Sequence, residues 1–197
     1  MSKLPPNHRF LDFSDYGRTP ARWIAHALKD TLVTPIHVTL LFGVVGLAAC
    51  GFMFSNHYYL AGLFLILKSI LDAADGELAR VKKTPSYTGR YLDSIFDILL
   101  NAVIIVSICY ITKGSIFIAV LAFLGIQLQG TLYNYYYVIL RNEFDGDNTS
   151  RINEKNVPIA FPGEKQKHVN LLYNIFNKYS LEVKFILELR TILITLT

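Results

Sequence analysis

The sequence predicts an all-α integral membrane protein, built as a polytopic bundle of helices. Its 197 residues are 52% hydrophobic and only 17% charged, and this charged fraction is low for a soluble domain. Apolar runs of about 20 residues, the length that crosses a bilayer as a helix, recur along the chain. Both cysteines fall inside such runs, so the sequence indicates buried thiols and no disulfide framework.

We expect at least four transmembrane helices. The first and fourth apolar runs contain no lysine, arginine or carboxylate, the second is interrupted by Lys68 before a group of acids begins, and the third is charged only at Asp93 and Asp97. The four runs lie at residues 35–54, 58–80, 91–112 and 114–140.

An amphipathic helix is predicted before the first span, lying at the membrane surface. The segment 1–33 contains acidic residues and lacks both a short apolar core and a small-residue cleavage site, which excludes a cleavable signal peptide. The helix is expected over 21–32, with apolar side chains at helical spacing at Trp23, Ile24, Ala27 and Leu28.

After the transmembrane domain, 34–140, a C-terminal segment covers 141–197. Residues 141–168 are rich in Asn, Asp, Gly and Pro and predict a loop outside the membrane. From residue 168 onward the pattern is amphipathic but repeatedly interrupted by charge. An interfacial helix and an incomplete helical hairpin are both compatible with it.

Basic residues give the orientation. They are concentrated in the N-terminal segment, in the link between the second and third spans, and after the fourth span, whereas the two opposite links are nearly neutral. Positive charge marks the cytoplasmic side. We therefore expect an integral membrane protein, in the inner membrane if it is bacterial, whose N-terminus and acidic group face the cytoplasm.

Four aspartates lie where the second and third spans meet. A charge at membrane depth costs roughly 2.5–3.5 kcal/mol on insertion scales, so four nearby acids require a compensating partner. Carboxylates from two facing helices suit hard, oxygen-seeking divalent cations. The pairs are spaced i, i+3 and i, i+4, which puts each pair on one helix face: Asp72 with Asp75, and Asp93 with Asp97.

Small residues accompany the acids. Gly76, Ala79 and Gly89 remove side-chain bulk where a ligand or the partner helix must come close. Arg80 flanks the acidic stripe, whereas Glu77 is expected to project away from it as an exposed or capping carboxylate. A purely structural salt-bridge network of the acids with Arg80, Lys82 and Arg90 is the alternative, but it explains neither the glycines nor the number of acids.

The motif resembles the signature of the CDP-alcohol phosphotransferases (CDP-alcohol phosphatidyltransferases). That signature reads Asp-x-x-Asp-Gly-x-x-Ala-Arg, eight residues, then Gly-x-x-x-Asp-x-x-x-Asp. The resemblance spans 26 residues, and eight specified positions at set spacing make a chance match improbable. All eight are present: Asp72, Asp75, Gly76, Ala79, Arg80, Gly89, Asp93 and Asp97.

The resemblance implies an enzyme in which an acceptor hydroxyl displaces CMP from a CDP-linked alcohol or lipid. It assigns Asp72, Asp75, Asp93 and Asp97 to a site for Mg²⁺ or Mn²⁺, with two metal ions expected. Asp97, together with Asp93, is placed in the catalytic machinery, and Asp97 is the expected base for the acceptor's proton. The CDP pocket is expected to include Asp75, Gly76, Ala79, Arg80 and Gly89.

The sequence departs from the family in two respects. Family members usually have six transmembrane helices, whereas four are predicted here, which leaves a truncated C-terminus open. The start of the first span resembles a family Pro-Asn-x-x-Thr pattern, but Ile36 stands at the Asn position, while Thr39 occupies the Thr position. We therefore assign no catalytic residue to the first span.

The predicted function is phospholipid synthesis by transfer of a phosphatidyl group from CDP-diacylglycerol to a hydroxyl acceptor. Expected partners are that donor, the acceptor, membrane lipids and a second copy of the chain, with no nucleic acid. One alternative is a CDP-choline or CDP-ethanolamine type of enzyme with a lipid acceptor. Alternatives from other classes are a divalent-cation transporter and an inactive membrane scaffold. The sequence does not identify the acceptor alcohol.

Overall fold

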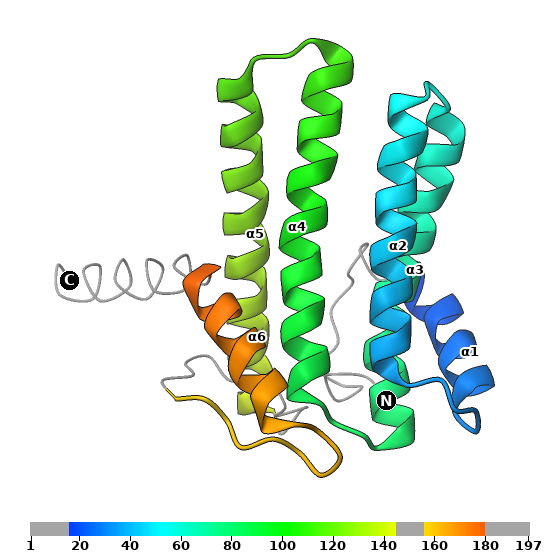
Figure 1. Ribbon diagram of the computed structural model, residues 1–197, viewed down its shortest axis with the longest axis vertical. Coiled ribbons are helices and arrows are strands. Elements are labelled where there is room, and N and C mark those ends of the chain that lie inside the picture. The colour runs from blue at the N-terminus through cyan, green and yellow to red at the C-terminus, as the bar shows by residue number, and fades with distance from the viewer. Residues whose placement is uncertain (1–15, 145–155, 180–197) are drawn as a thin grey trace, which may run out of the picture.

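The computed structural model of the protein describes residues 16–144 and 156–179 (Figure 1). Within these ranges the chain is helical and contains no strand, which confirms the all-α prediction. Six helices follow one another in this described part of the chain: α1 (Arg18–Leu28), α2 (Pro35–Phe54), α3 (Tyr58–Lys82), α4 (Tyr87–Thr112), α5 (Ile116–Glu143) and α6 (Gln166–Tyr179).

Local sequence explains where the long helices begin and end. Thr34 and His37 cap the start of α2 reciprocally: the His37 N–H donates to Thr34 Oγ1, and the Thr34 N–H donates to His37 Nδ1. Pro35 occupies the first turn of the same helix, where no N–H is needed. Helices α3 and α4 each end at a lysine in the left-handed conformation, Lys83 (φ 54°) and Lys113 (φ 51°).

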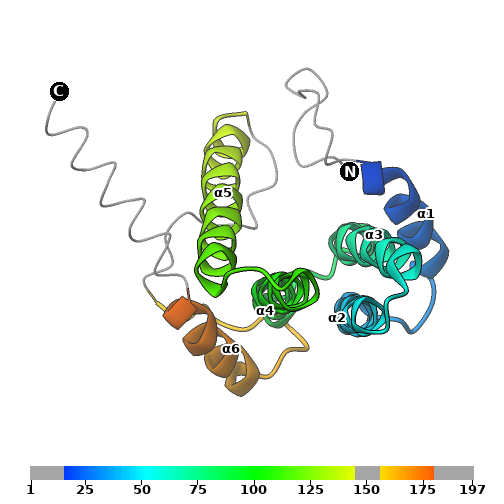
Figure 2. The same ribbon diagram turned by 90° about the horizontal axis from the view of Figure 1, so that it is seen from above.

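The long helices are arranged side by side, seen end-on in Figure 2. Helix α3 packs between α1 and α2, and α4 packs on α2, α5 and α6. Short links join α2, α3, α4 and α5, so these four helices run alternately up and down the bundle (Figures 1 and 2). Within the described residues, α5 packs mainly on α4, and much of its surface is open to lipid or to another chain.

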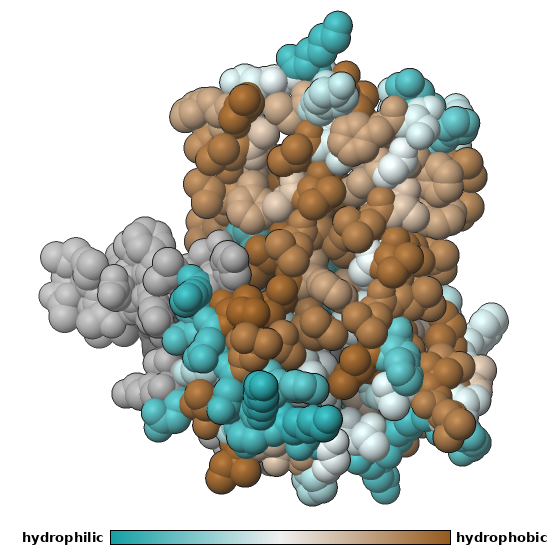
Figure 3. All heavy atoms as spheres, viewed as in Figure 1, coloured by the Kyte–Doolittle hydropathy of each residue, from teal (hydrophilic) through white to brown (hydrophobic). Residues whose placement is uncertain are grey.

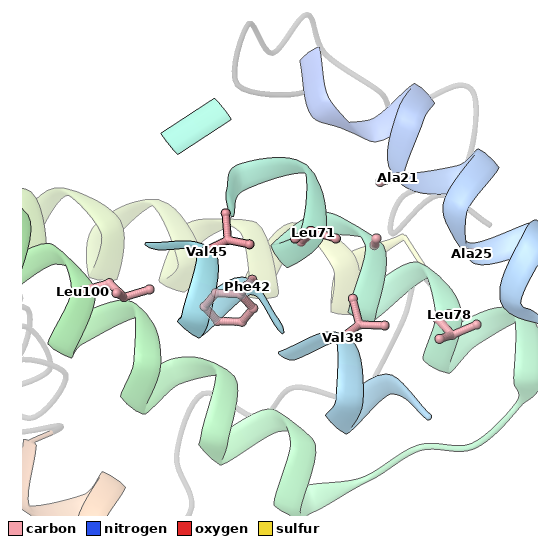
Figure 4. Packing of buried hydrophobic residues seen from close by; sticks show 9 residues of the cluster. Ala21, Ala25, Val38, Phe42, Val45, Leu71, Leu78 and Leu100 are labelled. Atoms are coloured by element: carbon pink, nitrogen blue, oxygen red, sulfur yellow. The ribbon is translucent and has the colours of Figure 1, made fainter. Parts of the chain in front are cut away.

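The main core lies where α1, α2, α3 and α4 meet, and Figure 4 shows its side chains. Two alanines on α1 allow that helix to approach α3 closely, while larger aliphatic and aromatic side chains fill the space between the others. The buried members are Ala21, Ala25, Val38, Phe42, Val45, Leu71, Ala74, Leu78 and Leu100.

Two glycines on α2 set the distance between α2 and α4. A Cβ at Gly46 would lie 2.7 Å from Leu100 Cδ1, and one at Gly43 would lie 3.0 Å from the Phe96 ring. Both contacts are closer than a methyl group normally allows, so the approach of α4 to α2 depends on these glycines. The close approach positions the α4 residues of the site beside α2 and α3.

Among the described residues, three helices are long and apolar enough to span a membrane: α2, α4, and α5 over Ile116–Leu140. The fourth expected span, α3, forms as one continuous helix of 25 residues, about 37 Å long at 1.5 Å per residue. It does not meet the same measure of apolarity, because Lys68 lies near its middle and the aspartates, Glu77 and Arg80 follow in its second half. That α3 crosses the bilayer beside α2 therefore stays a prediction.

Helix α1 confirms the predicted amphipathic helix but not all of its expected apolar face. The surface packed on the core consists of Ala21 and Ala25, with Ile24 and Leu28 partly buried beside them. Ala27 is exposed, and Trp23 is 74% exposed. Because α1 packs on α3 through its small residues, the indole projects away from the protein, as an aromatic anchor at a membrane surface does.

Polar residues collect at one end of the bundle, whereas apolar residues cover most of the length of the helices (Figure 3). This end contains α1, the link between α3 and α4, and the segment leading into α6 (Figure 1). Helix α6 packs on the first turns of α4 through a second cluster of buried side chains, Tyr91, Val169 and Tyr173. Of the expected loop at 141–168, residues 145–155 lie outside the described residues, and so does all of the amphipathic segment beyond residue 179.

Candidate active site at the charged end of α3 and α4

Three of the four motif aspartates converge. Asp72, Asp75 and Asp93 each contribute one carboxylate oxygen to a cluster, and these three oxygens lie within 4.8 Å of one another. Asp93 Oδ1 is buried and has no hydrogen-bond partner among the described residues. Three close carboxylates are mutually repulsive without a cation, and an unpartnered buried carboxylate oxygen suits a hard metal ion. The donor set therefore fits the divalent metal that the motif implies.

The first span, to which no catalytic residue is assigned, supports this site through a hydrogen bond. Thr39, on α2, is 1% exposed, and its hydroxyl donates to Asp75 Oδ2 over 2.5 Å. The hydrogen bond holds one of the converging carboxylates in position across the α2–α3 contact. Its signal in the sequence is the Thr of the imperfect Pro-Asn-x-x-Thr pattern, in which Ile36 replaces the Asn.

The fourth aspartate, Asp97, pairs with a residue that the sequence reading treated only as an interruption. Lys68 Nζ donates to Asp97 Oδ1 over 2.5 Å and lies 3.7 Å from Asp72 Oδ2. The ammonium also lies 5.0 Å from the centre of the Phe42 ring. Lys68 therefore joins the two helices that hold the acids. The i, i+4 spacing of Lys68 and Asp72 is the feature of the sequence that indicates a contact between this lysine and the motif acids.

Glu77 is buried, contrary to the expectation of an exposed carboxylate. It is 3% exposed, and its Oε1 lies 3.1 Å from Arg80 Nη2 and 3.9 Å from Arg22 Nε. Helix α1 covers this face of α3 and brings Arg22 to it, so the face that looked external in a single-helix reading is interior. The pair with Glu77 places the Arg80 guanidinium over Gly76, whose added Cβ would lie 3.6 Å from Arg80 Nη1.

Gly89 and Ala79 lie at the margins of the site. Gly89 is in the first turn of α4, its N–H donates to Ser86 Oγ over 2.8 Å, and a Cβ there would meet that oxygen at 3.2 Å. Ala79 is half-buried near the end of α3, and its carbonyl accepts from the Thr84 N–H that closes the helix. The nearest neighbours of a Cβ at Gly89 would be Ser86 and Ile36 rather than a carboxylate.

The salt-bridge alternative finds little support from the cations it named. Arg80 pairs with Glu77, and the Lys82 ammonium donates to the carbonyls of Thr31 and Val33. The Arg90 guanidinium lies over the rings of two tyrosines of α4. Within the part of the chain that the structure describes, Lys68 contacts two of the motif acids, Asp72 and Asp97.

A residue far along the chain closes the N-terminus of α4. Glu164 accepts from Ser86 Oγ (2.7 Å), from the N–H groups of Tyr87 and Thr88 at the start of the helix, and from the Phe161 N–H. Partial burial opposes ionisation of Glu164, but these hydrogen bonds outweigh it and hold the pKa of the carboxyl below its ordinary value. No sequence spacing indicated this contact, because 78 residues separate the partners.

Comparison with known proteins identifies the family. Residues 32–161, two thirds of the chain, match the family described as CDP-alcohol phosphatidyltransferase. The chain belongs to the CDP-alcohol phosphatidyltransferase family. The matched region begins just before α2 and includes all of α3 and α4, so it contains the three converging carboxylates together with Thr39, Lys68 and Asp97.

Curated relatives are similar over shorter stretches. The chain is 33% identical over 91 residues to an archaetidylinositol phosphate synthase of Pyrococcus horikoshii, covering 46% of the chain and 48% of that protein. It is 42% identical over 69 residues to a bifunctional IPC transferase and DIPP synthase of Thermococcus kodakarensis, covering 34% of the chain and 16% of that protein. The chain therefore aligns with about half or less of each relative's length.

Proposed function

We propose that the protein is a phospholipid-synthesising phosphotransferase that moves a phosphatidyl-type group from a CDP-activated lipid to a hydroxyl acceptor, with release of CMP. The observation that carries the proposal is the convergence of Asp72, Asp75 and Asp93 at the charged end of an apolar helix bundle. A lipid donor can lie in the bilayer there, while the cytidine phosphate and a polar acceptor approach from water. Family membership supports the reaction class.

Asp72, Asp75 and Asp93 would hold Mg²⁺ or Mn²⁺, with Thr39 orienting Asp75. The chemistry that such an ion would supply is neutralisation of negative charge on the pyrophosphate and on the departing CMP. Arg80 lies on the same helix, with its guanidinium over Gly76 and close to Glu77. It would contact a phosphate of the donor through the donors of its planar guanidinium group.

We assign to Asp97 the role of accepting the acceptor's proton. Its side chain is 39% exposed, and Lys68 occupies Oδ1, which leaves Oδ2 for a substrate hydroxyl. As the hydroxyl oxygen forms a bond to the lipid-bearing phosphorus, the bond from that phosphorus to the bridging oxygen breaks, and CMP leaves with the electron pair. The released proton passes to Asp97 and then to water.

For the donor we propose CDP-diacylglycerol or the corresponding CDP-activated diether lipid. For the acceptor we propose an inositol phosphate, because the relative with the largest mutual coverage among those described above is named as an archaetidylinositol phosphate synthase. Exposed Lys165 and Lys167 at the same end of the bundle add positive charge that favours an anionic acceptor. We also propose that this end faces the cytoplasm and that the chain functions as a homodimer.

The test is CMP release by purified full-length protein in detergent, supplied with Mg²⁺ or Mn²⁺. Each CDP-lipid is combined in turn with inositol phosphate, inositol, glycerol phosphate or serine, and the lipid product is identified by mass spectrometry. We expect a phosphorylated lipid headgroup product with one acceptor only. A CDP-choline or CDP-ethanolamine donor giving the sole activity would contradict the proposed donor, and metal uptake into vesicles without CMP release would favour a transporter.

A further inference from the structure

The geometry points to Lys68 as a built-in second cation of the acidic site, so that the protein binds one divalent ion where two are expected from its motif. The inference deepens the proposed function and rests on it, since it concerns the same metal site. Lys68 lies outside the motif, and the inference gives it the role of neutralising part of the negative charge of the motif aspartates.

The four aspartates divide into two groups in space. Oxygens from Asp72, Asp75 and Asp93 converge within 4.8 Å, and Asp97 is not one of that set. The Lys68 ammonium lies instead between Asp97 Oδ1, at 2.5 Å, and Asp72 Oδ2, at 3.7 Å. The positively charged Lys68 ammonium therefore bridges α3 and α4. It interacts with Asp97 and Asp72, the carboxylates from which a second metal ion would take its ligands.

The surroundings of Lys68 hold the ammonium in place. Its side chain is 13% exposed, and its ammonium lies over the face of Phe42, a core residue with no exposed surface. A cation over an aromatic ring in a mostly desolvated position is stabilised there. Because the same helix turn supports Lys68 and Asp72, the lysine cannot move far from the acids without leaving a buried charge unpaired.

Charge balance is consistent with one metal ion. Four ionised aspartates carry four negative charges, and Lys68 with one divalent ion supplies three positive charges. A second divalent ion would have to share Asp97 and Asp72 with the ammonium and would be repelled by it at short range. The fixed ammonium would instead keep Asp97 oriented, with one oxygen free for the acceptor hydroxyl.

The test counts Mn²⁺ ions bound to the full-length protein in detergent, by titration calorimetry and by electron paramagnetic resonance. Wild type is expected to bind one Mn²⁺ per chain with the spectrum of an isolated ion. Lys68→Met removes the ammonium but keeps a long apolar side chain, and is expected to bind two ions with a spin-coupled spectrum. Lys68→Arg, which retains the charge, should still bind one, as should Lys113→Met at the opposite end of α4.

Two bound ions in wild type would overturn the role of Lys68 while leaving the proposed metal site intact. A stoichiometry of one in a folded Lys68→Met protein would also overturn it. If Lys68→Met does not fold, Lys68→Arg and wild type still decide the matter, because a spin-coupled pair in either contradicts the inference. No bound ion in wild type would instead remove the proposed metal site itself.

Discussion

Replacing Thr39 by Val tests whether α2 takes part in the site. Valine has nearly the shape of threonine, so the buried position stays filled and only the hydroxyl is lost. The deleted hydrogen bond runs 2.5 Å to a carboxylate, Asp75 Oδ2, and hydrogen bonds to charged groups contribute about 1.5–3 kcal/mol. At 1.4 kcal/mol per factor of ten, Mn²⁺ affinity should fall about 10- to 100-fold, the range seen when a residue supporting a metal ligand is removed.

The assay is Mn²⁺ titration of detergent-purified protein, with thermal unfolding measured in parallel. Thr39→Ser keeps the hydroxyl and is expected to retain affinity within a few fold. Thr112→Val is the matched control at the opposite end of the bundle, where the lost hydroxyl is exposed and donates to backbone carbonyls of its own helix. A folded Thr39→Val protein with unchanged Mn²⁺ affinity would refute the reasoning.

Two further predictions concern the packing and the capping that position the site. Gly46→Ala should destabilise the protein by about 1–3 kcal/mol, because the added methyl group would overpack against Leu100. Gly51→Ala on the same helix is the control, because open space surrounds Gly51, and it should not destabilise the protein. Equal unfolding midpoints for the two variants would contradict the packing account. Glu164→Gln should cost about 1 kcal/mol at pH 7 by weakening the cap of α4. Because folding lowers the pKa of Glu164, the stability difference between wild type and Glu164→Gln should stay constant at pH values well above the ordinary pKa of 4.5. The difference should shrink as the pH falls below 4.5. A stability difference that grows in acid would refute the cap.

Much of the fold follows from the sequence because it depends on local patterns. Apolar runs of bilayer length predicted α2, α4 and α5. The motif likewise predicted the pairing of Asp72 with Asp75 along one helix, since i, i+3 spacing is a property of the helix alone. That Asp93 joins them required only that two consecutive helices face each other.

Contacts between distant segments could not be predicted in the same way. The face of α3 that carries Glu77 is interior only because α1 packs on it, and nothing in the local pattern shows which face α1 covers. The pairing of Lys68 with Asp97 depends on the register of α4 against α3, which the glycines of α2 help to set. The cap formed by Glu164 depends on a segment that returns to α4 after α5. Each requires the tertiary arrangement, which spacing along one helix does not contain.

The most direct test of the central claim compares CMP release by wild type and Asp93→Asn, with and without Mg²⁺ or Mn²⁺, using a CDP-activated lipid and the acceptor found in the screen. The account predicts metal-dependent release by wild type and a loss on the order of 10²-fold or more in the variant, with the fold of the variant retained. Release that is equal in the two proteins, or that is unaffected by chelation of the metal, would contradict an active site built on these carboxylates.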